Sequence, residues 1–213
     1  MDDIFRLIRN AASEGLQWDF YEDHDDVRNT CKKTIPGRVV QHFRSTCDDG
    51  RLSHRTIGLL TTYVSRRSLP CWFLYCDDER PPHASNGLLH WWLYSNCDID
   101  RFDELWTVEV NPRDKDGAII MDCRSQDTRA ANSAVANAAQ FARTNDDLHA
   151  ITSLSHAFCA FNVSPIGSLD NFEQWFVDFA VPCSLQGRPM SFDEEFALTD
   201  YDIPQALRKS ETN

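Results

Sequence analysis

The most compact set of potential metal ligands in the chain is His149, His156 and Cys159. In a helix, the two histidines would share a face and Cys159 would follow one turn later, whereas in a strand the histidines would point to opposite faces. A structural zinc site needs four ligands, and no fourth stands out nearby. A core histidine and a buried thiol are therefore the simpler interpretation, and we expect no metal or other cofactor.

The same stretch offers a candidate for nucleophilic catalysis. A cysteine nucleophile needs a base beside it, and Cys159 with His156 or His90 is the pair that the sequence suggests. Ser53 followed by His54 is a lesser candidate, and no G-x-S-x-G motif occurs. With eight cysteines and seven histidines in the chain, some proximity between them is expected by chance.

Acidic residues give a second catalytic hypothesis. Asp77 and Asp78 follow an apolar run, and strand ends hold metal-binding acids in nucleases and phosphatases. Because acidic pairs are abundant in this chain, a polar turn is the simpler interpretation. Glycine-rich phosphate loops do not occur. The enzyme alternative is therefore an intracellular hydrolase with either a Cys/His site or an Asp-bound metal.

Charge is unevenly distributed along the chain. The formal net charge is -12, which disfavours nucleic acid and anionic membranes as partners. Residues 32–67, however, carry eight Lys and Arg and only two acids. A solvated helical face is the simpler interpretation of this segment. The functional interpretation is a patch for an acidic protein segment or a phosphate, formed by Arg38, Arg44, Arg51, Arg55, Arg66 and Arg67.

The sequence shows no sign of export or membrane insertion. Met1-Asp-Asp is not followed by an apolar signal region, and no run approaches the roughly 20 apolar residues of a spanning helix. We therefore expect an intracellular, cytoplasmic protein whose cysteines are reduced.

Hydrophobic spacing predicts both helices and a sheet. Apolar residues recur at helical intervals near 2–13, 37–46, 54–65 and 126–142. Four aromatic-rich runs (69–76, 88–94, 105–110 and 118–123) are punctuated by turn signals and predict strands. The runs at 88–94, 148–163 and 172–181 are compatible with either strand or helix.

These patterns predict one α+β domain over residues 1–191, followed by an acidic, partly ordered tail over 192–213. A mostly antiparallel sheet is expected from 69 to 123, extended by strands from 148 to 181, with the helices covering it. The leading functional hypothesis is a non-enzymatic interaction or regulatory protein of the accessory type. Its basic helical hairpin, residues 32–67, would bind an acidic segment of another protein.

Overall fold

All the secondary-structure elements that can be described are helices. In the computed structural model, the described residues are 2–18, 29, 32–47, 49–74, 76, 79–95, 124–163, 168–199, 204 and 207. None of these residues lies in a strand, so the predicted α+β fold with a mostly antiparallel sheet is wrong. The elements are α1 (Asp2–Ser13), α3 (Ile35–Thr46), α4 (Gly50–Phe73), α5 (Arg80–Tyr94), α6 (Arg124–Thr144), α7 (Asp147–Val163), α8 (Leu169–Trp175), the π-helical turn η2 (Phe176–Ala180), α9 (Val181–Gln186) and α10 (Phe192–Glu195).

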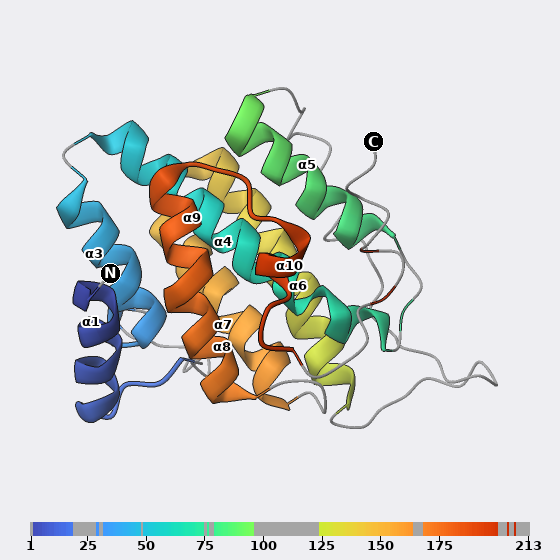
Figure 1. Ribbon diagram of the computed structural model, residues 1–213, viewed down its shortest axis with the longest axis horizontal. Helices are drawn as coiled ribbons and strands as arrows, with labels where there is room; N and C mark the ends of the chain where they lie inside the picture. The colour runs from blue at the N-terminus through green and yellow to red at the C-terminus, as the bar shows by residue number, and fades with distance from the viewer. Residues whose placement is uncertain are drawn as a thin grey trace.

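Helix α4 is the centre of the structure, and α3, α5, α6, α7 and α9 pack against it (Figure 1). It begins behind the N-cap Asp49, whose side chain accepts a hydrogen bond from the Arg51 N–H. From Thr56 to Trp72 every residue is buried. A helix that is buried on all sides has no polar face, so its sequence carries little of the amphipathic period by which helices are predicted.

Polar residues inside α4 are satisfied within the helix itself. Thr61 and Thr62 donate to the Gly58 carbonyl at 3.0 and 2.7 Å. Ser65 donates to the Thr62 carbonyl at 2.9 Å, and Ser68 donates to the Ser65 carbonyl at 2.7 Å. Because these hydroxyls need no outside partner, the helix can be buried without exposing them to water.

The predicted helix at 54–65 is confirmed, but α4 continues through Pro70 to Phe73. A proline inside a helix lacks the N–H donor and normally ends the helix. The aromatic-rich run at 69–76 was predicted to be a strand, but its residues 69–73 form the last turns of α4 instead. Packing on several sides holds the last turns of α4 in the helical conformation, since Leu69, Cys71 and Trp72 are fully buried.

The run at 88–94 belongs to α5, so its helical alternative is correct. Trp92 is buried against Gly58 of α4, where a Cβ atom would overlap the indole ring. The absence of a side chain at Gly58 thus lets α5 approach α4. The runs predicted as strands at 105–110 and 118–123 lie outside the described residues.

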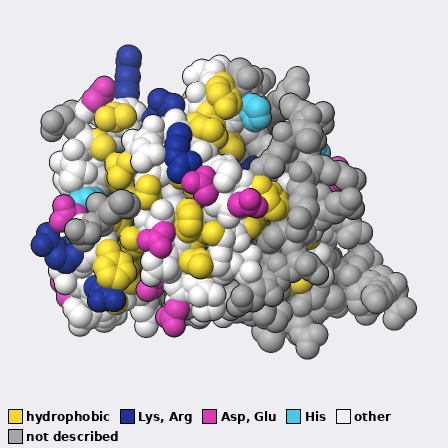
Figure 2. Space-filling view, in the orientation of Figure 1, with side chains coloured by type: hydrophobic (Ala, Val, Ile, Leu, Met, Phe, Trp, Pro, Cys, Tyr) yellow, Lys and Arg dark blue, Asp and Glu magenta, His cyan; other side chains and the backbone are white. Residues whose placement is uncertain are grey.

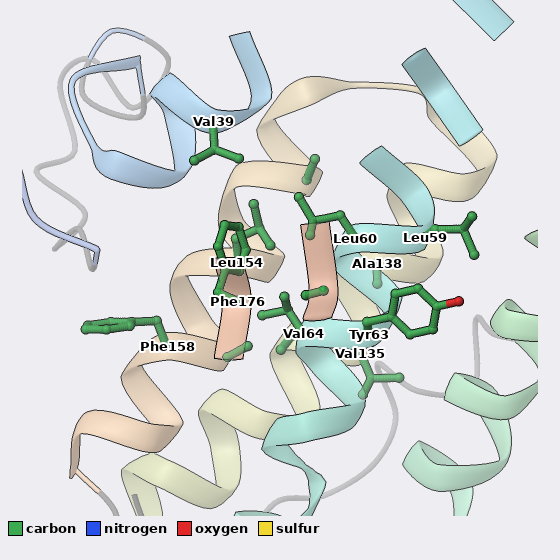
Figure 3. Close-up of a cluster of buried hydrophobic side chains, with 14 of the residues drawn as sticks. Val39, Leu59, Leu60, Tyr63, Val64, Val135, Ala138, Leu154, Phe158 and Phe176 are labelled. Carbon is green, nitrogen blue, oxygen red and sulfur yellow. The ribbon is translucent and has the colours of Figure 1, made fainter. Parts of the chain in front are cut away.

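The predicted helix at 126–142 is confirmed as part of α6, but its alanine face packs on helices α7 and α4 instead of a sheet. The close approach to α7 is marked by Ser153, which donates to the Ala134 carbonyl at 2.8 Å. The run at 148–163 is helical and forms most of α7. Figure 3 shows where these helices meet, and its labelled residues include Leu60, Val64, Val135, Ala138 and Leu154.

The predicted strand at 172–181 is instead an unbroken helical segment made of α8, η2 and α9. Its wide π turn comes just before Pro182, and the Val181 N–H donates to the carbonyl of Phe176, five residues earlier. Pro182 has no N–H to donate, so the regular helical hydrogen-bond pattern is interrupted at this residue. The π turn lies just before this interruption. Phe172 and Phe176 are fully buried by this segment.

The predicted helices at 2–13 and 37–46 are confirmed as α1 and α3. Beyond α1, Trp18 is buried and donates from Nε1 to Glu173 Oε1 at 2.6 Å. Its ring stacks on Phe158 with centroids 5.3 Å apart. Trp18 therefore fastens the N-terminal segment to α7 and α8.

Candidate interaction surface around Arg55

The three residues considered for a zinc site all lie on α7, and the two histidines share a face. His149 Nδ1 lies 3.1 Å from Asn137 Oδ1, and His156 Nδ1 lies 2.7 Å from Ser133 Oγ. Both partners belong to α6, so the histidines link two helices. Within the described residues, no group of three or more His, Cys, Asp or Glu side chains is placed to hold a metal ion.

The residues considered for catalysis are spread over different helices. His90 is exposed on α5, and its ring contacts Tyr94 of the same helix at a centroid distance of 5.7 Å. Cys159 is half-buried on α7, one turn after His156. Helix α5 packs chiefly against α4 and α6, so His90 and Cys159 belong to different packing interfaces. Asp77 and Asp78 lie outside the described residues.

Two arginines of the predicted basic hairpin form ion pairs with other helices. Arg38 is exposed and lies 3.5 Å from Glu14. Arg44 donates from Nε and Nη2 to one carboxylate oxygen of Asp147, at 2.9 and 2.8 Å. It also donates to Asn145 and to Ser53 Oγ. Arg44 therefore connects α3 to the α6–α7 turn and to the start of α4.

Arg66 and Arg67 are buried. The Arg66 guanidinium makes a two-point ion pair with Glu195, at 2.7 and 3.0 Å, and also donates to Asn86 Oδ1. Arg67 donates to the carbonyls of Glu195 and Ala197, both at 2.7 Å. Both arginines of the predicted patch thus bind an acidic segment, but it is a segment of the same chain.

Arg51 and Arg55 remain at the surface, in the first turns of α4. Arg55 is anchored by its Nε, which donates to the Trp92 carbonyl at 3.1 Å, and by Nη2, which lies 3.4 Å from the Gly187 carbonyl. These contacts bring together the start of α4, the end of α5 and the end of α9. They hold the guanidinium in place and leave the side chain exposed.

Three exposed hydrophobic side chains lie close to these anchoring points. Leu52 precedes Arg55 by one helical turn, Tyr94 follows Trp92 by two residues, and Leu185 precedes Gly187 by two residues. Their exposed fractions are 50%, 58% and 48%, respectively. We define the Arg55 surface as Arg51, Leu52, Arg55, Tyr94 and Leu185. The upper part of Figure 2 shows hydrophobic and basic side chains next to one another.

The Arg55 surface rests on an aromatic layer that includes His54. The His54 ring lies 5.0 Å from both Trp92 and Phe141, and its Nε2 lies 3.3 Å from the Phe141 carbonyl. Burial lowers the pKa of His54 below its usual value, and the nearby charge of Arg44 acts in the same direction, although the bond to Phe141 opposes them. The histidine beneath the surface is therefore neutral at pH 7.

The sequence pointed to Arg51 and Arg55 but missed the hydrophobic members of the surface. Gly187 marks the end of α9, but a helix end does not by itself predict that Leu185 is exposed. No sequence signal indicated that this turn would lie beside α4 and α5. That proximity depends on tertiary packing.

A second surface feature is a groove of about 460 Å³ between α1 and α3. Its charges are paired locally, because Arg6 lies 2.9 Å from Asp3 and Arg38 lies 3.5 Å from Glu14. The groove therefore has little net charge with which to select a ligand. It is lined by Asp3, Arg6, Leu7, Asn10, Ala11, Glu14, Arg38 and His42.

Two further findings bear on function. Of the helices that the structure describes, none combines the length and the apolar composition needed to cross a membrane. In comparisons with protein families, with curated proteins and with solved structures, nothing matches this chain.

Proposed function

We propose that this is a non-enzymatic interaction protein that binds another protein through the Arg55 surface. The observation that carries the proposal is an anchored, exposed arginine that joins the ends of three helices, each with an exposed large hydrophobic residue in its terminal turn. Arginine and aromatic residues dominate the binding energy of protein interfaces. Exposed hydrophobic groups that gather in one place mark interaction surfaces.

The proposed partner is a protein segment with an acidic residue between apolar side chains. The acidic residue would pair with Arg55 or Arg51, and the apolar side chains would cover Leu52, Tyr94 and Leu185. The protein as a whole carries a net charge of -12, so most of its surface repels an acidic segment. A local basic surface attracts such a segment and therefore directs it to one place on the protein. An anchored arginine also loses little side-chain freedom on binding.

The proposal includes a cytoplasmic location. Cys183 is buried and forms no disulfide, which agrees with a reducing compartment. For the hydrolase alternative, His90 lies on a different helix from Cys159, and His156, one turn before Cys159 on α7, has its Nδ1 2.7 Å from Ser133 Oγ.

The test is quantitative affinity capture from the cells that make the protein, followed by mass spectrometry. The double variant R51E/R55E and the single variant L185S are each expected to lower the capture of the same partner at least tenfold. R38E is the matched control, because Arg38 is also an exposed arginine but lies on α3 beside Glu14.

Equal capture by wild type, R51E/R55E and L185S would contradict the proposal. So would a partner that R38E loses to the same extent. Far-UV circular dichroism of each variant checks that the helices are intact, which is expected because all four substituted positions are exposed.

A further inference from the structure

The C-terminal strap, residues 188–199, lies over α4 and the α8–η2–α9 segment (Figure 1). It begins after Gly187, which has a φ of +61° and ends α9. Its first residues include Arg188, whose carbonyl accepts a hydrogen bond from the Tyr63 hydroxyl at 2.6 Å. The short helix α10 follows, and its Glu195 pairs with the buried Arg66.

The rest of the protein binds the strap mainly through hydrogen bonds to the strap's backbone. Donors on α4 and α8 bind four strap carbonyls: Tyr63 binds that of Arg188, Trp175 binds that of Glu194, and Arg67 binds those of Glu195 and Ala197. Carbonyls are present in any peptide, so these four contacts do not depend on the strap's sequence. They would be available to another segment that followed the same path.

One strap side chain is recognised by its charge. Glu195 is buried and accepts from two nitrogens of Arg66, and the exposed fractions of these side chains are only 5% and 7%. Such two-point pairing is specific for a carboxylate. Asn86 of α5 holds the same guanidinium from another direction. Arg66 is therefore fixed in place by the protein body.

An aromatic side chain follows the recognised carboxylate. Phe196 is buried, with 6% of its surface exposed. Its ring contacts Phe192 of the strap at a centroid distance of 4.9 Å. Arg67 binds the carbonyls on either side of Phe196, and its guanidinium lies 4.3 Å from the Trp175 ring centroid and 5.5 Å from that of Phe161. The groove beneath the strap thus provides a site for a Glu followed by a Phe, along with donors for the backbone on either side.

We infer that this groove is a peptide-binding site that the strap occupies in cis, and that an acidic segment of a partner protein binds there in exchange for the strap. The partner segment carries a glutamate followed by an aromatic residue. Charge complementarity supports this occupant, because Arg66 and Arg67 are both buried cations that already bind an acidic segment. The strap groove is a different site from the Arg55 surface, and the inference does not depend on the proposed function.

The test uses the full chain and a fluorescent peptide with the sequence of residues 188–199. Binding is measured by fluorescence anisotropy. E195Q should release the strap, because the neutral amide cannot pair with Arg66, and the peptide is expected to bind this variant at least tenfold more tightly than wild type. A second variant, F196S, weakens the strap through its apolar contact and should act in the same direction.

Three matched controls test the specificity of the groove. A peptide in which the residue corresponding to Glu195 is glutamine should bind at least tenfold more weakly to the E195Q protein. Adding Arg66→Met to the E195Q protein should remove the binding of the original peptide. The R51E/R55E variant in the E195Q background should bind the peptide unchanged, which separates this site from the Arg55 surface.

Three outcomes would overturn the inference. The first is the absence of saturable peptide binding to folded E195Q and F196S. The second is unfolding of both variants, because the strap would then be an inseparable part of the core. The third is a wild-type dimer that Arg66→Met abolishes, because the groove would then belong to a second copy of this chain.

Discussion

At the scale of single residues, Gly58 is the position where the packing of α4 tolerates no side chain. Gly58→Ala should gain up to about 1 kcal/mol from helix propensity. The added Cβ would overlap the Trp92 indole, however. Overpacking of this kind costs about 1–3 kcal/mol, so we expect Gly58→Ala to lower the free energy of unfolding, measured by urea denaturation.

Gly50→Ala is the matched control, because an added Cβ at Gly50 meets nothing within 4 Å. This substitution should leave the free energy of unfolding unchanged or raise it by up to about 1 kcal/mol. If the two substitutions had the same effect, the close approach of Trp92 to Gly58 would not be a determinant of stability.

His54 provides a prediction about pH. Its folded-state pKa is lowered, chiefly by burial, so the unfolded chain takes up a proton at this residue at a higher pH than the folded protein does. The stability contributed by neutral His54 is complete above the unfolded pKa of about 6.5. It falls as the pH drops below that value toward the folded pKa.

The measurement is urea denaturation of wild type and His54→Gln at pH 7 and pH 5. The free energy of unfolding should fall more for wild type than for the variant, because glutamine does not titrate. A wild-type protein whose pH dependence matched that of His54→Gln would contradict the lowered pKa.

At the scale of elements, the strap is held by its own short helix as well as by α4. The α10 N-terminus is a capping box, in which Ser191 Oγ accepts from the Glu194 N–H and the Glu194 side chain accepts from the Ser191 N–H. Arg188 donates to both Glu194 oxygens, at 2.8 and 3.0 Å. The bonds from Arg188, followed by those from Ser191, lower the pKa of Glu194 to about 2.

This arrangement predicts that the strap loosens in acid. A carboxyl whose folded pKa is depressed stabilises the fold above its unfolded pKa of about 4.3, and this contribution is lost as the pH falls toward the folded value near 2. Because the pair is partly exposed, we expect Glu194→Gln to cost only about 1–2 kcal/mol at pH 7. Hydrogen exchange of residues 188–199 would report the loss locally.

Asp193→Asn is the matched control for this element, because Asp193 is an exposed carboxylate next to Glu194. It should change the free energy of unfolding by less than about 0.5 kcal/mol. If hydrogen exchange of the strap were faster in Asp193→Asn than in Glu194→Gln, the loosening would come from the loss of negative charge on α10 and not from the loss of the Arg188–Glu194 contact.

At the scale of the whole molecule, the arrangement of helices around α4 explains which predictions failed. The amphipathic helices α1 and α3 were predicted because each has a buried and an exposed face. The second half of α4 is buried on every side, and α7 is buried over much of its surface. Their apolar and small residues therefore have no helical period, and short apolar runs of this kind resemble strands.

The candidate sites, like the fold, could be predicted from the sequence only in part. The sequence located the basic segment and the acidic tail that begins at residue 192. It did not separate the exposed Arg51 and Arg55 from the buried Arg66 and Arg67, because all four lie on one helix. Exposure depends on which neighbours pack against each turn of α4, and those neighbours come from distant parts of the chain.

By itself, the sequence determined the local properties of this protein: the helices with one apolar face and the segregation of charge. Such features depend on contacts between residues that are close in sequence. The tertiary structure decided that the aromatic runs at 69–76 and 88–94 contribute to helices. It also decided that Glu195 meets Arg66 and that Leu185 lies close to Arg55. These outcomes depend on burial between segments far apart in the chain, where packing overrides local propensity.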